Sequence, residues 1–204
     1  MKKTYIIILA ILLVAFLGYN SVYFKKLSDV KNEKKENIDF KAYADSIYYK
    51  GILKNKKNIT LTDLISLVQT NPEKAFKKYG NRLGIGNSAY FMVQSTGKIL
   101  DIKDGLYTIA DEKNGVVYID TKYIFGNAIR DASGLVKLTD FKTNAQFNKV
   151  SESLNDIIRN EVLPNELKKV KIGDSVSFTG AIKLSKKQNL FKDITVIPSQ
   201  IKPQ

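Results

Sequence analysis

The residues of this 204-residue sequence best suited to chemistry are Arg130 and Asp131, an adjacent pair that closely follows Asn127. We expect them in a polar loop that leaves the third strand of a sheet. A guanidinium there could hold a carboxylate, a phosphate or a sugar hydroxyl in a fork, while Asp131 accepts hydrogen bonds from hydroxyls. The alternative is a structural pair, in which Arg130 meets a carboxylate such as Asp140 and Asp131 caps the turn that follows. The candidate ligand-binding residues are Asn127, Arg130, Asp131, Asp140 and Asn144.

Three residue types are absent from the sequence, namely cysteine, histidine and tryptophan. Without cysteine there is no disulfide, thiol nucleophile or thiolate zinc site, and without histidine the usual general base and transition-metal ligand are missing. No nucleophile elbow, phosphate loop or HExxH motif is present. We therefore expect a protein that binds and does not catalyse, with no catalytic residue, metal or cofactor. An envelope hydrolase using a pair of carboxylates is the enzymatic alternative.

Two other groups of side chains are weaker candidates for a ligand site than Arg130 and Asp131. Asp101, Asp104, Asp111 and Glu112 are expected to cluster around one hairpin end, but their spacing follows no calcium-binding loop. Acidic side chains in hairpin turns are ordinary solvated surface. We therefore predict no metal site there.

Aromatic residues on or beside the predicted strands could stack on sugars or bases. Alternation along a strand sends about half of such side chains inward, so core packing is the alternative for each. The aromatic residues are Tyr107, Tyr118, Tyr123 and Phe125.

A long apolar stretch from Tyr5 to Phe24 is bracketed by lysine pairs at residues 2–3 and 25–26. Its length suffices to cross a hydrocarbon core, and no small-residue cleavage pattern follows it. We predict a transmembrane signal anchor over residues 1–26, a polar tether over 27–38, and a C-terminal domain held outside the cytoplasm by a single membrane pass. The membrane is therefore an expected partner. A domain outside the cytoplasm is not expected to bind nucleic acid.

Helical periodicity begins after the tether. A helix is expected over residues 40–54 with Asp39 as its cap, a second begins after Thr60, and a third starts at Pro72 after the Asn71 cap. These elements form a predicted helical subdomain over residues 39–80. Farther along, an amphipathic helix from Phe147 to Ile158 is expected to end at Pro164.

After Gly80 the period changes from 3.6 to 2, which indicates strands. Short apolar runs over 89–94, 98–102, 106–110 and 116–120 are separated by Asp104-Gly105 and Asn114-Gly115, which are strong hairpin signals. The first two runs are read as one strand bent at Gly97. Two further strands are expected over 176–182 and 194–197.

The order of three strands, one helix and two strands is that of an OB-fold. We predict an α+β fold, in which an OB-fold-like, five-stranded antiparallel barrel over residues 81–204 lies behind the N-terminal helical layer. Residues 39–204 are expected to form one structural unit.

A specific pattern runs through the middle of the chain. It reads Gly126, Ala128, Ile129, Arg130, Asp131 and Ala132, then Asp140 and Phe141, then Phe147, Val150, Leu154 and Asn155 along a helix. With the stretches 40–53 and 79–86, this pattern resembles the bacterial family of predicted periplasmic lipoproteins of unknown function, domain-of-unknown-function family 2291. The sequence departs from the family pattern in lacking the lipobox cysteine and in having Thr143 and Asn144 where an Asn-Gln pair is expected.

The resemblance implies an extracytoplasmic, membrane-attached protein that supports a sugar-type ABC transporter. Without the cysteine, the apolar stretch must provide the attachment. We therefore expect a binding or interaction module that contacts an ABC transporter, its solute-binding protein or its ligand. The alternative is an electrostatic binder of anionic polymer or lipid, since 33 Lys and Arg against 20 Asp and Glu give a formal charge of +13.

Overall fold

The computed structural model describes residues 2–55, except 22–37, and residues 58–204, except 83, 85 and 188–192. It divides into two compact units, Met1–Ile38 and Asp39–Gln204. Almost all of the predicted tether, residues 27–37, lies outside the described residues.

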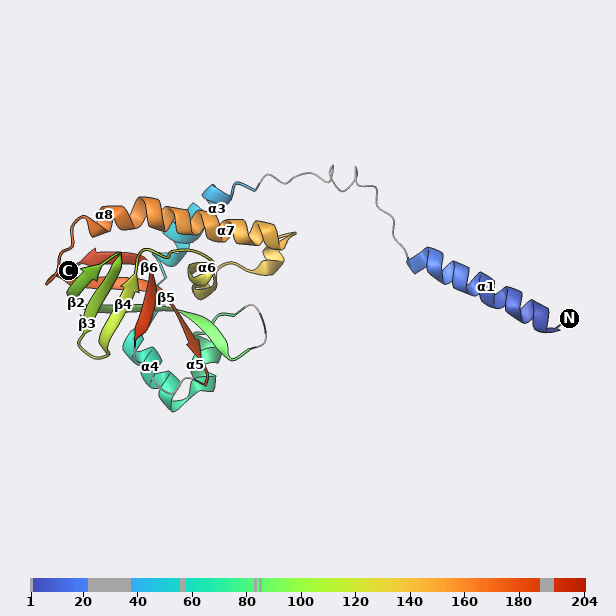
Figure 1. Ribbon diagram of the computed structural model, residues 1–204, viewed down its shortest axis with the longest axis horizontal. Coiled ribbons are helices and arrows are strands. Elements are labelled where there is room, and N and C mark those ends of the chain that lie inside the picture. The colour runs from blue at the N-terminus through green and yellow to red at the C-terminus, as the bar shows by residue number, and fades with distance from the viewer. Residues whose placement is uncertain (1, 22–37, 56–57, 83, 85, 188–192) are drawn as a thin grey trace. The chain divides into compact units, whose positions relative to one another are not determined.

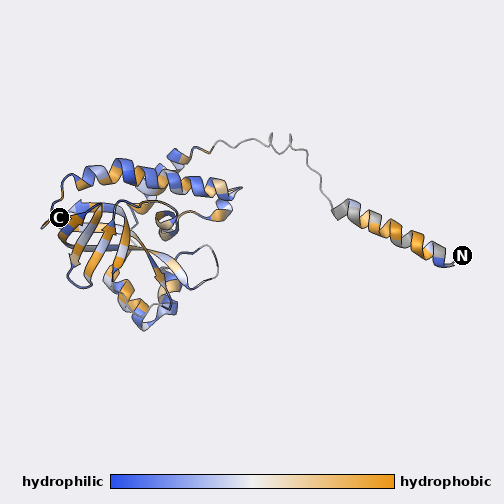
Figure 2. Cartoon of the chain, viewed as in Figure 1, coloured by the Kyte–Doolittle hydropathy of each residue, from blue (hydrophilic) through white to orange (hydrophobic). Residues whose placement is uncertain are grey.

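The first unit contains helix α1, Lys2–Ser21, which has no acidic residue in its first turn and no basic residue in its last. Most of its described residues are hydrophobic (Figure 2). In contrast to the predicted transmembrane segment, the described residues include no helix that is both long enough and apolar enough to cross a membrane.

The second unit begins with two groups of helices. Helix α3, Phe40–Asp45, continues into the π-helix η1, Ser46–Ile52, and packs against the later helix α7. Helices α4, Leu61–Thr70, and α5, Pro72–Lys78, pack against each other. The two groups lie on opposite sides of the sheet (Figure 1). The expectation of one N-terminal helical layer is therefore wrong, because the chain crosses the sheet edge between them as the short strand β1, Ile59–Thr60.

The predicted helix starts are confirmed by their caps. The Asp39 carboxylate accepts from Ala42 N at 2.9 Å, and Thr60 Oγ1 accepts from Asp63 N at 3.1 Å. Each bond satisfies an amide that the first helical turn leaves without a partner.

Six strands make up the sheet. They are β1, Ile59–Thr60; β2, Ser88–Lys103; β3, Leu106–Asp111; β4, Gly115–Asp120; β5, Ser175–Ser185; and β6, Ile194–Pro203. Their order is β1-β2-β3-β4-β6-β5, and β2 also pairs with β5. The pairings of β2, β3, β4, β6 and β5 thus close on themselves, and we call these five strands the strand ring.

The strand ring differs from the prediction in one pairing. Strands β4 and β6 are parallel, whereas β2–β3, β3–β4, β2–β5 and β5–β6 are antiparallel. The expectation of a wholly antiparallel arrangement is therefore wrong. The parallel pair arises because β6, and not β5, follows β4 in the ring. Strand β5 runs opposite to β4, and β6 reverses the direction once more and therefore runs with β4. Strand β1, which was not predicted, adds a short parallel pair to β2.

The predicted hairpin and the joining of the first two runs into one strand are confirmed. Asp104 and Gly105 both adopt positive φ, 49° and 81°, as a two-residue turn between β2 and β3 requires. Strand β2 runs unbroken through Gly97, where an added Cβ would lie 2.5 Å from the carbonyl oxygen of Ala110.

Between β4 and β5 lies a run of helical segments. They are α6, Ala128–Ser133; the 3₁₀ turn η2, Leu138–Asp140; α7, Asn144–Asp156; the π-helix η3, Ile157–Val162; and α8, Leu163–Leu167. Pro164 does not end the helix, as was predicted, but lies in the first turn of α8.

The main core fills the strand ring and the helix faces turned toward it. Apolar side chains alternate along the strands, and those facing inward are at most a few per cent exposed. Examples from the strands are Phe91, Val93, Ile109, Ile119, Phe178 and Val196. A smaller cluster of Val136, Phe147 and Val150 holds α3 against α7, with Tyr43 and Phe141 at its edge.

Strands β5 and β6 approach each other closely at Gly180. A Cβ at this position would lie 2.4 Å from the carbonyl oxygen of Ile197, which is backbone and cannot rotate away. We expect Gly180→Ala to lower the free energy of unfolding by about 2–3 kcal/mol. Urea unfolding of the full chain in detergent, followed by circular dichroism, measures this change.

Gly86→Ala is the matched control, since nothing lies within 4 Å of the added Cβ, and should change stability by less than about 0.5 kcal/mol. Equal effects of the two substitutions would contradict the close approach of β5 and β6.

Candidate functional site

The predicted site residues around Arg130 lie in a helix and not in a polar loop. All six residues of α6, Ala128 to Ser133, are buried. The expectation of a loop failed because α6 is too short to show a helical period. Burial of a charged pair changes its energetics, since charges removed from water must be paired.

Arg130 and Asp131 bind each other inside the protein. Arg130 is 2% exposed and Asp131 7%. Arg130 Nε and Nη2 each lie 2.8 Å from the same carboxylate oxygen, Asp131 Oδ1, and Asn127 Nδ2 donates to Oδ2. The structural partner of Arg130 is therefore Asp131 and not Asp140, which instead accepts from Lys137 N at 3.2 Å.

The third nitrogen of the guanidinium and its flat face also contact neighbouring groups. Nη1 donates to the carbonyl oxygen of Phe147 at 3.1 Å and to Asn148 Oδ1 at 3.4 Å. The guanidinium carbon lies 3.5 Å from the centroid of the Phe147 ring. Arg130 thereby joins α6 to the first turns of α7.

A pocket of about 670 Å³ opens beside this pair, between α7 and the segment that follows β4. Its buried lining includes Arg130, Ser151 and Asn155. We call it the Arg130 pocket. The remaining lining residues are Phe125, Gly126, Asn127, Asn148, Glu152, Asp156 and Arg159.

Helix α7 and its continuation supply most of the lining. Asn148, Ser151, Asn155 and Arg159 are spaced by three or four residues and so share one helix face. The neighbouring face carries the apolar side chains that enter the core. The sequence contained this polar stripe, but the prediction used only the apolar one, and so Ser151, Asn155 and Arg159 were missed as site residues.

Aromatic and cationic side chains form the outer part of the pocket. The Arg159 guanidinium lies 4.7 Å from the centroid of the Phe125 ring, donates to the carbonyl oxygen of Ile124 at 3.2 Å and pairs with Asp156. Phe125 is 58% exposed. Among the other predicted aromatic candidates, Tyr107 is buried in the core, whereas Tyr123 is exposed.

The five predicted site residues do not all come together. Asn127 and Arg130 line the pocket, and Asp131 lies directly behind Arg130. Asp140 and the exposed Asn144 do not line it. Asn144 is the first residue of α7, next to the Thr143 side chain that caps the helix.

One side chain of the pocket has an unsatisfied polar atom. Ser151 is 5% exposed, and its hydroxyl oxygen has no hydrogen-bond partner among the residues that the structure describes. Burying a hydroxyl without a partner costs about 1–3 kcal/mol. A native structure rarely carries such a group without a reason.

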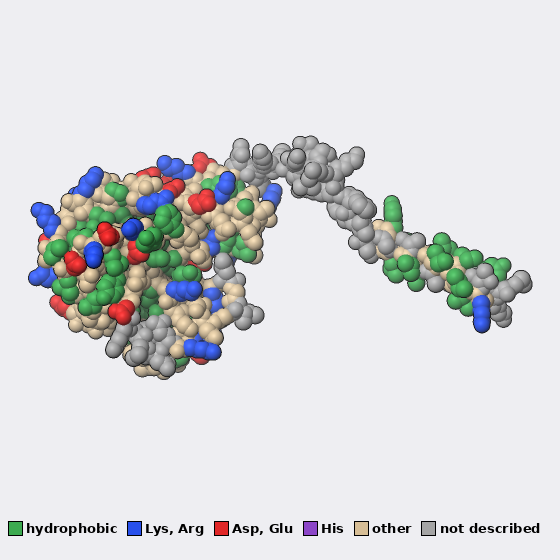
Figure 3. Space-filling view, viewed as in Figure 1, with side chains coloured by type: hydrophobic (Ala, Val, Ile, Leu, Met, Phe, Trp, Pro, Cys, Tyr) green, Lys and Arg blue, Asp and Glu red, His purple; other side chains and the backbone are tan. Residues whose placement is uncertain are grey.

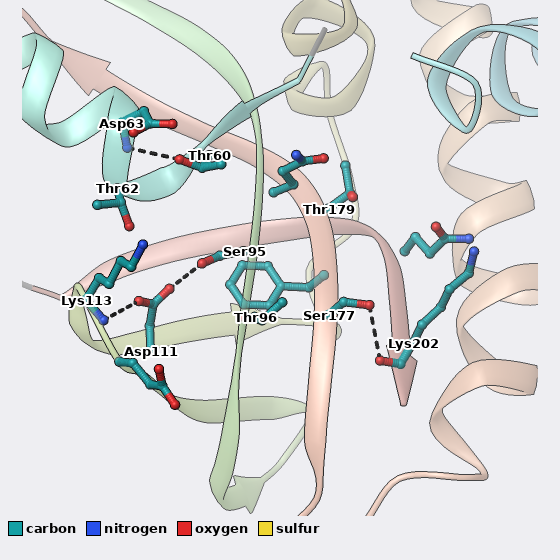
Figure 4. A pocket seen from close by; sticks show the side chains of 14 residues that line it. Thr60, Thr62, Asp63, Ser95, Thr96, Asp111, Lys113, Ser177, Thr179 and Lys202 are labelled. Atoms are coloured by element: carbon teal, nitrogen blue, oxygen red, sulfur yellow. Dashed lines mark hydrogen bonds between the residues drawn. The ribbon is translucent and has the colours of Figure 1, made fainter. Parts of the chain in front are cut away.

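A second pocket, of about 490 Å³, lies where the start of α4 faces β2 and β5 (Figure 4). Its buried carboxylate, Asp111, is fully engaged. It accepts from Ser95 Oγ, from the amides of Lys113 and Asn114 at 3.0 Å each, and from Asn114 Nδ2 at 2.8 Å. Burial by itself raises the pKa of Asp111, but these hydrogen bonds together bring the pKa below its ordinary value.

Asp111 therefore has a structural role in the second pocket. Asn114 Nδ2 also donates to Thr62 Oγ1 at 2.9 Å, which fixes the β3–β4 turn against α4. Asp104 and Asp111, expected near one hairpin end, lie at opposite ends of β3. The Arg130 pocket, with its unsatisfied buried hydroxyl, is the stronger candidate.

Exposed apolar side chains also gather on the outer face of β2, β3 and β4, with charged groups among them (Figure 3). Leu100, Leu106 and Val116 are 38–49% exposed. Among the residues that the structure describes, no buried polar atom of β2, β3 or β4 lacks a hydrogen-bond partner.

Comparison with known proteins adds a family and a fold. The family model for predicted periplasmic lipoproteins, domain-of-unknown-function family 2291, matches residues 12–202. An OB-fold protein from Thermotoga maritima shares 27% identity with a TM-score of 0.70, over 83% of this chain and all of that chain. The predicted resemblance and the OB-fold are thereby confirmed.

A second solved structure, an OBody bound to hen egg-white lysozyme, shares 13% identity over 58% of this chain and 80% of that chain. Its TM-score of 0.24 is too low to carry an argument. No curated protein matches the chain.

The buried pair is expected to be essential for the fold around the pocket. Asp131→Asn keeps the shape but leaves the Arg130 guanidinium without its counter-charge, and should lower the free energy of unfolding by about 3–5 kcal/mol. Urea unfolding of the full chain in detergent measures it.

The exposed pair of Lys186 with Glu73, at 2.7 Å, provides the control. The Glu73 side chain is 78% exposed, so Glu73→Gln should cost less than about 1 kcal/mol. A cost for Asp131→Asn no larger than this would show that the buried pair is not needed.

Proposed function

The chain belongs to the family of predicted periplasmic lipoproteins, domain-of-unknown-function family 2291, and from this premise we propose that it is a binding module whose ligand enters the Arg130 pocket. The family description implies an extracytoplasmic location and association with the membrane. An extracytoplasmic module at the membrane meets solutes before they are transported. A pocket of about 670 Å³ has the size of a small-molecule site.

The means of attachment is a separate part of the proposal. The 204 residues contain no cysteine to carry a lipid. The apolar stretch from Tyr5 to Phe24, flanked by lysines, then holds the chain at the membrane as a single-pass anchor. The absence of histidine and cysteine supports a module that binds and does not catalyse.

The unpartnered hydroxyl of Ser151 is the observation that carries the proposal. A group kept at a cost in stability is expected at a functional site. A ligand that enters the pocket and contacts Ser151 would supply the missing hydrogen bond.

Ser151→Ala should therefore stabilise the chain without ligand and weaken ligand binding. Removal of an unsatisfied buried hydroxyl is expected to raise the free energy of unfolding by about 1 kcal/mol. Thermal unfolding of the full chain in detergent measures the first effect. Native mass spectrometry of chains incubated with a small-molecule extract of the cell envelope measures the second, as loss of a retained compound.

Ser153→Ala is the matched control, because Ser153 lies on the same helix but does not line the Arg130 pocket. It should retain the compound with unchanged thermal stability. If both variants behave alike in both assays, the pocket is not the binding site.

We further propose that the module assists a solute transporter, by contacting the transporter's binding protein or its ligand. A tagged full chain, recovered from detergent-solubilised membranes with and without added sugars, should carry transporter components. Recovery of no such component under either condition would remove this part of the proposal, whatever the outcome for Ser151.

A further inference from the structure

We infer that the Arg130 pocket takes an uncharged ligand with several hydroxyl groups, and that Arg130 shapes the pocket and does not bind a ligand's charge. The inference rests on the proposed function, since it concerns the same pocket. The sequence allowed a carboxylate, a phosphate or a sugar hydroxyl as the ligand of Arg130, and the inference favours hydroxyl groups.

An anionic ligand is disfavoured because the guanidinium is already occupied. A carboxylate or phosphate is held by two parallel N–H donors of the fork. Nε and Nη2 of Arg130 both lie 2.8 Å from Asp131 Oδ1, and Nη1 donates to Phe147 O. The Asp131 carboxylate also neutralises the charge that would attract an anion.

A cationic ligand is disfavoured at the buried end of the pocket. An ammonium group next to Ser151 or Asn155 would lose its hydration in the low-dielectric interior, where Arg130 and Asp131 already neutralise each other. Asp156, a carboxylate that lines the pocket, is paired with Arg159. Glu152 forms no ion pair with any described residue, but it is exposed to water, where its attraction for a cation is weak.

An uncharged hydroxyl compound fits the groups that are left. Asn155 Nδ2 donates to Gly126 O at 2.9 Å, and Asn127 Nδ2 donates to Asp131, which leaves the Oδ1 atom of each as an acceptor. Asn148 Oδ1 accepts from Arg130, which leaves its Nδ2 as a donor.

The unpartnered Ser151 hydroxyl can both donate and accept a hydrogen bond. The lining therefore offers both donors and acceptors. A hydroxyl group, which has both capacities, matches such a lining better than a group that only donates or only accepts.

Isothermal titration calorimetry of the full chain in detergent tests the inference with matched sets of probes. Each set contains an uncharged sugar or polyol and its carboxylated, phosphorylated and amino counterparts, for example glucose, glucuronate, glucose 6-phosphate and glucosamine. We expect at least one uncharged probe to bind at least about tenfold more tightly than each charged counterpart. Ser151→Ala should weaken that binding about tenfold, and Ser153→Ala should leave it unchanged.

The other outcomes separate the inference from the proposed function. Tighter binding of a charged probe that still depends on Ser151 overturns the ligand class and leaves the pocket as the binding site. Binding that Ser151→Ala and Ser153→Ala affect equally overturns both. No binding by any probe overturns the ligand class, and the retention of a compound from the envelope extract then decides the proposed function.

Discussion

Strand β2 is shared between two neighbours, and the rest of the second unit depends on this sharing. From Ser88 to Lys98 it pairs with β5, and from Lys98 to Lys103 with β3, so that Lys98 is in register with both neighbours. Such a strand must bend at the point of exchange, and Gly97 lies there with no room for a Cβ. The shared strand closes the five pairings into a ring and creates the enclosed core.

The ring also determines where a binding pocket can form. Because β4 is followed in the ring by β6, the chain between β4 and β5 has to cross the ring on its outside. That crossing carries α7 and the segment that follows β4, which together with Arg130 of α6 line the Arg130 pocket. The buried pair of Arg130 with Asp131 fastens α6 to α7 by hydrogen bonds, so it maintains the pocket without needing to contact a ligand.

Local signals in the sequence were sufficient for much of the fold. Caps at Asp39 and Thr60 and the Asp104-Gly105 turn act over a few residues, and each is realised in the structure. The features that were missed depend on tertiary context. The parallel pairing of β4 with β6 depends on the path of the crossing, and a six-residue helix such as α6 is too short to show a period.

The site was only partly predictable for the same reason. Arg130 and Asp131 were found from their residue types, but their mutual pairing and burial depend on the neighbouring α7. Ser151 is an ordinary residue in the sequence, and it becomes informative only when its hydroxyl is seen buried without a partner. The polar stripe on α7 was the available signal.

The pairing of β2 with β5 has a consequence for the time that the chain needs to fold. The two strands are separated in sequence by β3, β4 and all the helices of the crossing, so their contact requires closure of a long loop. Loop closure entropy must be overcome before such non-local pairs form, and chains rich in them fold slowly. Until β5 arrives, the first half of β2 has a free edge, which makes the partly folded chain the form most exposed to strand-to-strand aggregation.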